Sequence, residues 1–288
     1  MVALALLVPF SSSGAVDRGK LIEKAEMSML VTGSIDMRAD GSVERYAIDH
    51  SDKLSNAVIQ LIGAQVSQWR FEPTLVDGQP VAARTNMSLR IVAKPLDEQN
   101  FDVRIQSASF SGGGGKDDRM SVEKRSSLRP MIEAMASTGM DTADLYVALK
   151  VGPDGKVLDA AVEQVNLGTI GGDVWMAKAR RLLGNSALEV VRKWTFSVPS
   201  RGQLAGRSYW SGTLPFSLEM LDGPLPPSGI DEYGRWKAYV PGPCMPIPWR
   251  MDGVENGNSP CTSDAAPEGV LSLDNSGPEL LTPLMQGG

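Results

Sequence analysis

Histidine, the side chain that most often moves protons in enzymes, occurs once in the 288 residues, as His50. A zinc site with two histidines is therefore excluded, and a Ser-His-Asp triad would have to use His50. The sequence has no Gly-x-Ser-x-Gly motif that would supply a nucleophile. The simpler interpretation places His50 beside the N-terminus of a helix, with Ser51 or Asp52 as the helix cap.

Acidic side chains offer a second kind of chemistry, because paired carboxylates can act as general acid and base. Asp36, Asp40 and Asp49 lie in or beside predicted strands, and their spacing does not bring them to one point. A calcium loop around Asp40 is not expected either, because Arg38 and Ala39 supply no oxygen ligands. An enzyme based on carboxylates is the least favoured hypothesis, and we expect no cofactor and no metal site.

A glycine-rich stretch, Ser111–Lys116, has the composition of a phosphate-binding loop without its pattern. Such a loop needs a glycine where Phe110 stands and a serine or threonine where Asp117 stands. We therefore interpret residues 111–127 as a flexible linker between two domains.

The two cysteines, Cys244 and Cys261, have sixteen residues between them. In an oxidising compartment we expect them to form a disulfide, which stabilises the fold by about 3 kcal/mol in the chain-entropy model. Two reduced thiols are the alternative if the protein stays in the cytosol. Two cysteines alone make a poor metal site.

Composition and charge argue against nucleic acid as a partner. The formal net charge is −6 and the sequence pI is about 5.0. Basic residues form no contiguous run longer than pairs such as Lys124-Arg125 and Arg180-Arg181, whereas a nucleic-acid binder usually shows a basic patch. Hydrophobic residues make up 42% of the chain, which is ordinary for a soluble protein with room for two small cores.

The first fifteen residues resemble the apolar and cleavage regions of a secretory signal peptide, ending in Ser13-Gly14-Ala15. The positively charged start of such a signal is missing, so either the true start lies upstream or the signal does not work. We expect export to the periplasm, with a mature N-terminus near Val16. We expect no integral membrane span, because the apolar run Val2–Phe10 is too short for one.

The predicted helices and strands, on which any site would lie, form a pattern that occurs twice in the chain. A strand, a turn, a strand, a helix and a strand follow each other at Val31–Lys94 and again at Leu145–Met220. The apolar positions of the first strands coincide when the two segments are aligned on the turn glycines, Gly41 and Gly155. The predicted fold class is α+β, with two small domains, each a strand-strand-helix-strand antiparallel sheet with one helix packed on it.

The predicted boundaries follow from this repeat. The domains span residues 28–94, with a candidate extra strand at 101–110, and residues 129–220, and their helices span about 52–68 and 174–193. Residues 221–288 are rich in proline and glycine, and we expect an irregular or disordered tail. Its aromatic residues Trp236, Tyr239 and Trp249 could pin part of it to a domain surface.

The motifs at the end of the first repeat resemble a known family. Trp69-Arg70-Phe71-Glu72-Pro73 is followed by Asp77-Gly78-Gln79-Pro80-Val81 and a last strand, which is similar to the C-terminal domain of TonB, the periplasmic energy transducer. The second repeat resembles this domain too. The chain therefore looks like a tandem of TonB-like domains, without the family's usual membrane anchor and proline-rich spacer, so we do not expect an energy transducer.

The resemblance implies a site for an extended peptide. In the TonB family the strand that corresponds to Val81–Lys94 lies at a sheet edge and pairs with a short receptor segment. An edge strand offers unpaired backbone groups to such a segment, and side chains tune the choice. We expect this edge to bind an envelope protein or an extended peptide, for example from an outer-membrane receptor. The side chains concerned are those of Arg84, Asn86, Ser88 and Arg90.

A structural role is the main alternative. The two repeats would then pack on each other as a pseudo-dimer, occupy their own edges and serve as a scaffold. An open Val81–Lys94 edge favours peptide binding, whereas a covered edge, for example under residues 101–110, favours the scaffold.

Overall fold

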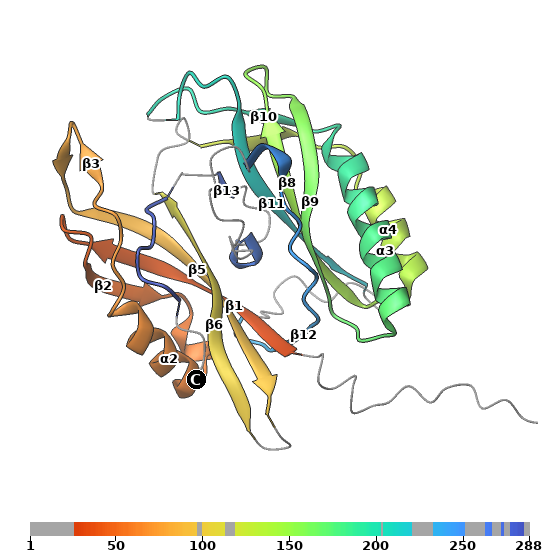
Figure 1. Ribbon diagram of the computed structural model, residues 1–288, viewed down its shortest axis with the longest axis horizontal. Coiled ribbons are helices and arrows are strands. Elements are labelled where there is room, and N and C mark those ends of the chain that lie inside the picture. Colours follow the sequence, from red (N-terminus) through yellow and green to blue (C-terminus); the bar gives the residue numbers. More distant parts are fainter. Residues whose placement is uncertain are drawn as a thin grey trace, which may run out of the picture.

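The computed structural model describes residues 26–96, 100–112, 119–202, 204–220, 233–250, 263–266, 272–273 and 277–284. The described residues form three α-helices and antiparallel sheets, so the predicted α+β class is confirmed. In Figure 1 the two main sheets face each other, with the helices on the outer sides. The predicted signal segment, residues 1–15, lies outside the described residues, as do residues 113–118 of the predicted linker.

The first sheet is built on two long paired strands. Its order is β12–β1–β5–β6, in which β12 (Lys237–Tyr239) comes from the C-terminal segment, and β2 also pairs with β1. The elements that this half contributes are β1 (Glu26–Met37), β2 (Val43–Ile48), α2 (Asn56–Val66), β5 (Ala83–Pro95) and β6 (Phe101–Gly112). Alternating apolar residues of β1 and β5 face α2, and the predicted core residues Trp69 and Phe71 are buried with them.

Helix α2 begins later than the sequence pattern predicts. Ser55 is its N-cap, and the Ser55 hydroxyl accepts a hydrogen bond from the Val58 amide at 3.4 Å. The predicted cap at Ser51 or Asp52 is therefore wrong for this helix. Those residues form a 3-10 turn, η1 (Ser51–Lys53), which follows His50 in a left-handed conformation with φ 46°.

The second sheet repeats the arrangement. Its order is β13–β11–β8–β9, in which β13 (Ser272–Leu273) comes from the C-terminal segment, and the two-stranded pair β7–β10 lies apart from it. The elements of this half are β7 (Ser121–Lys124), α3 (Arg129–Thr138), β8 (Thr142–Val151), β9 (Val157–Leu167), α4 (Asp173–Val191), β10 (Thr195–Ser197) and β11 (Trp210–Glu219). Its own core contains Leu183 and Val191 of α4, together with the predicted core residue Trp194.

The two turns on which the repeat was aligned have the same geometry. Gly41 has φ 78° and Gly155 has φ 74°, values that favour glycine. The carbonyl of Gly41 accepts a hydrogen bond from the Phe71 amide at 2.9 Å, and the carbonyl of Gly155 accepts one from the Phe196 amide at 2.8 Å. Each turn is thus held by the segment that follows the helix of its own half.

A small hairpin projects from the first half, on the left in Figure 1. It consists of β3 (Leu75–Val76) and β4 (Gln79–Pro80), joined by Asp77 and Gly78, both with positive φ. This is the Asp-Gly turn that matches the twist of a two-residue hairpin.

The segment after residue 220 is more regular than predicted, because several of its described parts are short strands or 3-10 turns. Tyr239 is buried and the Trp249 indole donates to the Ser211 hydroxyl, so these two aromatic residues do pin it to the domains. Its elements are β12 (Lys237–Tyr239), η3 (Pro248–Arg250), η4 (Ser263–Ala265) and β13 (Ser272–Leu273). β12 pairs with β1 of the first sheet, and β13 pairs with β11 of the second. Further on, Leu280 forms a bridge with Phe71, so the segment returns to the first half. It contacts both halves in turn.

Candidate functional site

The strand predicted to be an open edge lies inside the sheet. β5 pairs with β1 from Ala83 to Ala93 and, on its other side, with β6 from Thr85 to Pro95. Its backbone groups are engaged on both sides, so the predicted edge at Val81–Lys94 is wrong. The covering strand is β6, which contains the candidate extra strand, residues 101–110.

The four predicted side chains lie on one face of β5, the face turned away from α2. They differ in their exposure to solvent. Arg84 and Asn86 are exposed, whereas Ser88 and Arg90 are buried with exposed fractions of 4% and 7%. This difference in exposure arises because η4 and the second half cover only the part of β5 around Arg90. The structure therefore does not gather these residues into one accessible site.

The three aspartates considered for catalysis are engaged separately. Asp36 forms ion pairs with Arg45 and, at 3.1 Å, with Arg84. The hydrogen bond from Arg45 holds the pKa of the Asp36 carboxyl below its usual value. Asp40 accepts hydrogen bonds from the amide and hydroxyl of the following Ser42, and Asp49 accepts one from a threonine of β1. As predicted, they do not converge.

The side chain of His50 takes part in an aromatic packing contact. Its ring packs edge-on against the ring of Tyr233, with centroids 5.2 Å apart. The Tyr233 hydroxyl donates to the carbonyl of Thr32 and accepts from the Thr32 amide. Tyr233 thus occupies the outer side of β1 between the residues paired with β12 and those paired with β2.

A buried polar cluster joins the two sheets and the C-terminal segment. We call it the Arg90 cluster. Its members are Ser28, Arg90 and Ser107 of the first sheet, Tyr146 of the second sheet, Tyr239 of β12 and Asp264 of η4.

Arg90 connects all three parts. Its guanidinium donates to the Tyr146 hydroxyl at 2.8 Å, to the backbone carbonyl of Asp264 at 2.9 Å and to the Ser28 hydroxyl at 3.2 Å. At 3.7 Å it also forms an ion pair with Asp144, which lies on β8 beside the cluster. A buried guanidinium needs such partners, because an unpaired buried charge is costly.

Asp264 places a buried carboxyl group in the cluster. Its carboxylate accepts hydrogen bonds from the Tyr239 hydroxyl at 2.8 Å and from the Ser107 hydroxyl. Burial raises the pKa of the Asp264 carboxyl, although these donors and Arg90 act in the opposite direction. Burial also raises the pKa of Tyr146 and of Tyr239 far above the usual tyrosine value, so both hydroxyls remain protonated donors.

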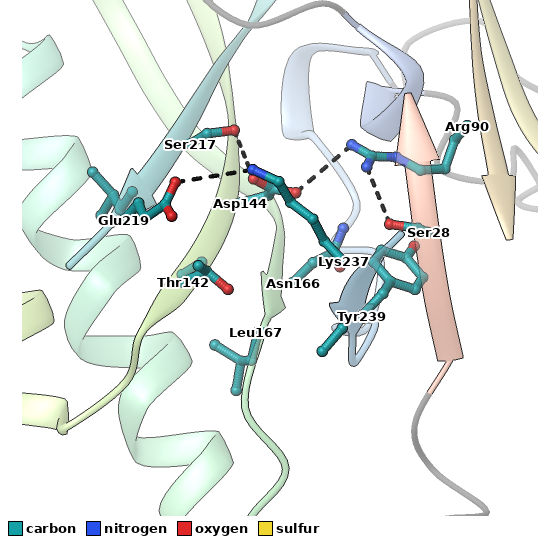
Figure 2. Close-up of a pocket in the computed structure, with 14 residues that line it drawn as sticks. Ser28, Arg90, Thr142, Asp144, Asn166, Leu167, Ser217, Glu219, Lys237 and Tyr239 are labelled. Carbon is teal, nitrogen blue, oxygen red and sulfur yellow. Dashed lines mark hydrogen bonds and ion pairs between the residues drawn. The ribbon is translucent and has the colours of Figure 1, made fainter. Parts of the chain in front are cut away.

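A small pocket lies beside the cluster, where the sheets and β12 meet. Figure 2 shows Arg90 and Ser28 on one side of it and Asp144 and Ser217 on the other, and the Ser217 hydroxyl donates to Asp144 at 2.7 Å. Lys237 of β12 reaches towards Glu219 at 3.9 Å. The pocket is thus lined by two cations, Arg90 and Lys237, and by two carboxylates, Asp144 and Glu219.

The size and chemistry of this pocket suit water better than a large ligand. Its volume is about 50 Å³, room for a few waters, whereas ligand pockets have several hundred Å³. Asn166, which lines it, has a buried side-chain nitrogen without a hydrogen-bond partner in the described part of the chain. Across the described ranges, no group of three or more acidic, histidine or cysteine residues could hold a metal ion.

The predicted disulfide falls partly outside the described residues. Cys244 is disulfide-bonded, and the sequence contains one other cysteine, Cys261, which is not among the described residues. Asp264 has no signal in the sequence that marks it as a site residue, because it lies in a short turn far from Arg90 along the chain. Among the described helices, none is long and apolar enough to cross a membrane.

Neither a family model, nor a curated protein, nor a solved structure matches this chain.

Proposed function

We propose that this protein is a scaffold of the cell envelope in which two TonB-like repeats are packed face to face as a pseudo-dimer. The observation that carries the proposal is the Arg90 cluster. Side chains from both repeats and a backbone carbonyl of the C-terminal segment satisfy one buried guanidinium there. A buried charge that depends on three separate segments favours one fixed arrangement of the two halves.

The strand edges support the same proposal. β1 pairs with β5 on one side. Its other side is occupied by β2, Tyr233 and β12. On β9, Leu167 exchanges two backbone hydrogen bonds with Val240, and the Met245 amide donates to the carbonyl of Glu163. The chain thus occupies these two edges, at β1 and β9, and protects them from other strands.

Hydrogen exchange on the oxidised full chain tests the scaffold. We expect the slowest amides of β5 and β8 to exchange through one global opening, with equal free energies, because neither half can release Arg90 without exposing it. Amides of the β3–β4 hairpin serve as the internal control and should exchange much faster. If β8 opens with a clearly lower free energy than β5, the halves are independent and the proposal fails.

The periplasmic location is part of the proposal. The disulfide at Cys244 supports an oxidising compartment, and the apolar start of the chain supports export. Cell fractionation with N-terminal sequencing tests it. We expect a periplasmic protein that begins near Val16, and an unprocessed cytosolic protein with reduced thiols would contradict it.

Recognition of an extended peptide is the second candidate, at a different strand. β11 occupies the place in the second repeat that β5 has in the first, and in the described residues only Gly212 and Thr213 pair on its outer side, with β13. A peptide from an envelope partner, such as an outer-membrane receptor, would displace β13. Pro215 limits this pairing because it has no amide to donate.

Amide NMR with peptides from outer-membrane receptor N-termini separates the two candidates. Shifts confined to β11 and β13 would support peptide recognition by the second repeat. Without shifts at either strand, the scaffold is favoured.

A further inference from the structure

The outer side of β6 is a strand edge that the described part of the chain leaves unpaired over residues 101–106. β6 has twelve residues and pairs with β5 on one side only. Gly277 lies against the carbonyl of Phe110, near the C-terminal end of β6. Along residues 101–106, no described segment is paired to the outer side. An edge of this length normally needs a partner or a guard against one.

The two faces of this part of β6 differ in chemistry. Ile105 is buried on the face towards α2, Val103 packs against the same core, and Phe101 is 45% exposed. The opposite face carries Asp102 and Arg104. Arg104 forms ion pairs with Asp102 at 3.3 Å and with Glu26 of β1 at 3.1 Å. After Ile105 the register with β5 shifts, which ends this regular stretch.

We propose that two copies of this chain associate by antiparallel pairing of β6 with β6, centred on Val103. A twofold axis perpendicular to the sheet keeps both α2 helices on the same side. It also requires a register centred on a residue, because only then do opposed side chains point to the same face. The first sheets of the two copies become one continuous sheet.

Charge complementarity selects this register. It places Asp102 of each copy opposite Arg104 of the second copy, so the pair occurs twice, and Glu26 lies beside each arginine. On the other face, the exposed ring of Phe101 meets Ile105 of the second copy. A register centred on Ile105 would place Asp102 opposite Ala108 and Arg104 opposite Gln106, without an ion pair.

Sedimentation of the full chain over a range of concentrations tests the pairing. We expect a dimer that dissociates on dilution. Asp102→Arg places two arginines opposite each other, and Arg104→Asp places two aspartates opposite each other, so each variant should dissociate about tenfold more readily or worse. Glu44→Arg on β2 makes the same charge change as Asp102→Arg at another exposed position and should leave the dimer unchanged.

Mixing the two variants is the decisive step. In the mixed dimer, the arginine introduced at position 102 of one copy lies opposite the aspartate introduced at position 104 of the other. The second pair keeps its natural residues, Asp102 and Arg104. The mixture should therefore form dimers at concentrations at which each variant alone is mostly dissociated.

Thermal melts establish that each variant is folded. A single-chain mass for the wild type at every concentration overturns the proposal. A dimer that both variants leave intact, or a mixture that stays monomeric, overturns it as well. These outcomes concern mass, so they are independent of the hydrogen-exchange test of the scaffold.

Discussion

Replacing Arg90 with methionine should lower the free energy of unfolding by about 3–5 kcal/mol, the usual loss when one partner of a buried charge pair is removed. Only 9% of the Arg90 side chain is exposed. The variant loses the hydrogen bonds to Tyr146, to Ser28 and to the backbone carbonyl of Asp264. It also loses the ion pair with Asp144 and leaves that carboxylate without its buried cation. Methionine retains most of the apolar stem, so the loss reports the charge and its hydrogen bonds rather than a cavity.

Urea unfolding, followed by circular dichroism and tryptophan fluorescence, measures this loss. Arg84→Met is the matched control, because Arg84 lies on the same face of the same strand with a side chain 64% exposed and an ion pair to Asp36. An exposed ion pair contributes at most about 1 kcal/mol. If the two variants lose equal stability, or if Arg90→Met loses less than about 1 kcal/mol, then Arg90 does not hold the halves together.

Three other perturbations test local features of the fold. Gly41→Val and Gly155→Val should each cost about 2 kcal/mol or more, because the new Cβ would lie 1.9 Å from the Phe71 carbonyl oxygen and 2.1 Å from that of Phe196. Wild-type melting temperatures would contradict the assigned turns. Because the pKa values of Tyr146 and Tyr239 are raised, their stabilising effect is complete below pH 10.0, the usual tyrosine pKa, and is lost above it as the unfolded chain ionises. The double variant Tyr146→Phe, Tyr239→Phe should lose less stability than the wild type between about pH 8 and pH 11, and an equal loss in urea titrations would refute the assignment. Reducing the disulfide at Cys244 should lower the free energy of unfolding by about 3 kcal/mol, and an unchanged melt in reductant would contradict it.

The repeat could be predicted from the sequence because its signals are local. Alternation along a strand and helical spacing depend on neighbouring residues, and the glycine at each turn reports a backbone angle at one position. The burial of Trp69 and Trp194 at matching places shows how far such signals reach. The sequence pattern predicts the start of α2 a few residues too early, because Ser51, Asp52 and Ser55 all have side chains suited to capping.

The C-terminal segment could not be predicted in the same way. β12 has three residues and β13 has two, which is too short for a periodic pattern. Their conformation depends on strands far away in the sequence, β1 and β11, that offer free backbone groups. Proline and glycine indicate that such a segment lacks regular structure of its own, but they do not tell whether another element binds it.

The environment of Arg90 could have been suspected from its neighbours. Polar residues at alternate positions, from Arg84 to Arg90, predict a solvent-exposed face when they are considered alone. Leu89, Ile91, Val92 and Ala93, however, form a nearly continuous apolar run around Arg90, and such a run is typical of a strand buried on both faces. An arginine inside it must find buried partners, since arginine is almost never buried unpaired. Its identity as a link between two sheets required Asp264 and Tyr146, which only the folded chain brings to it.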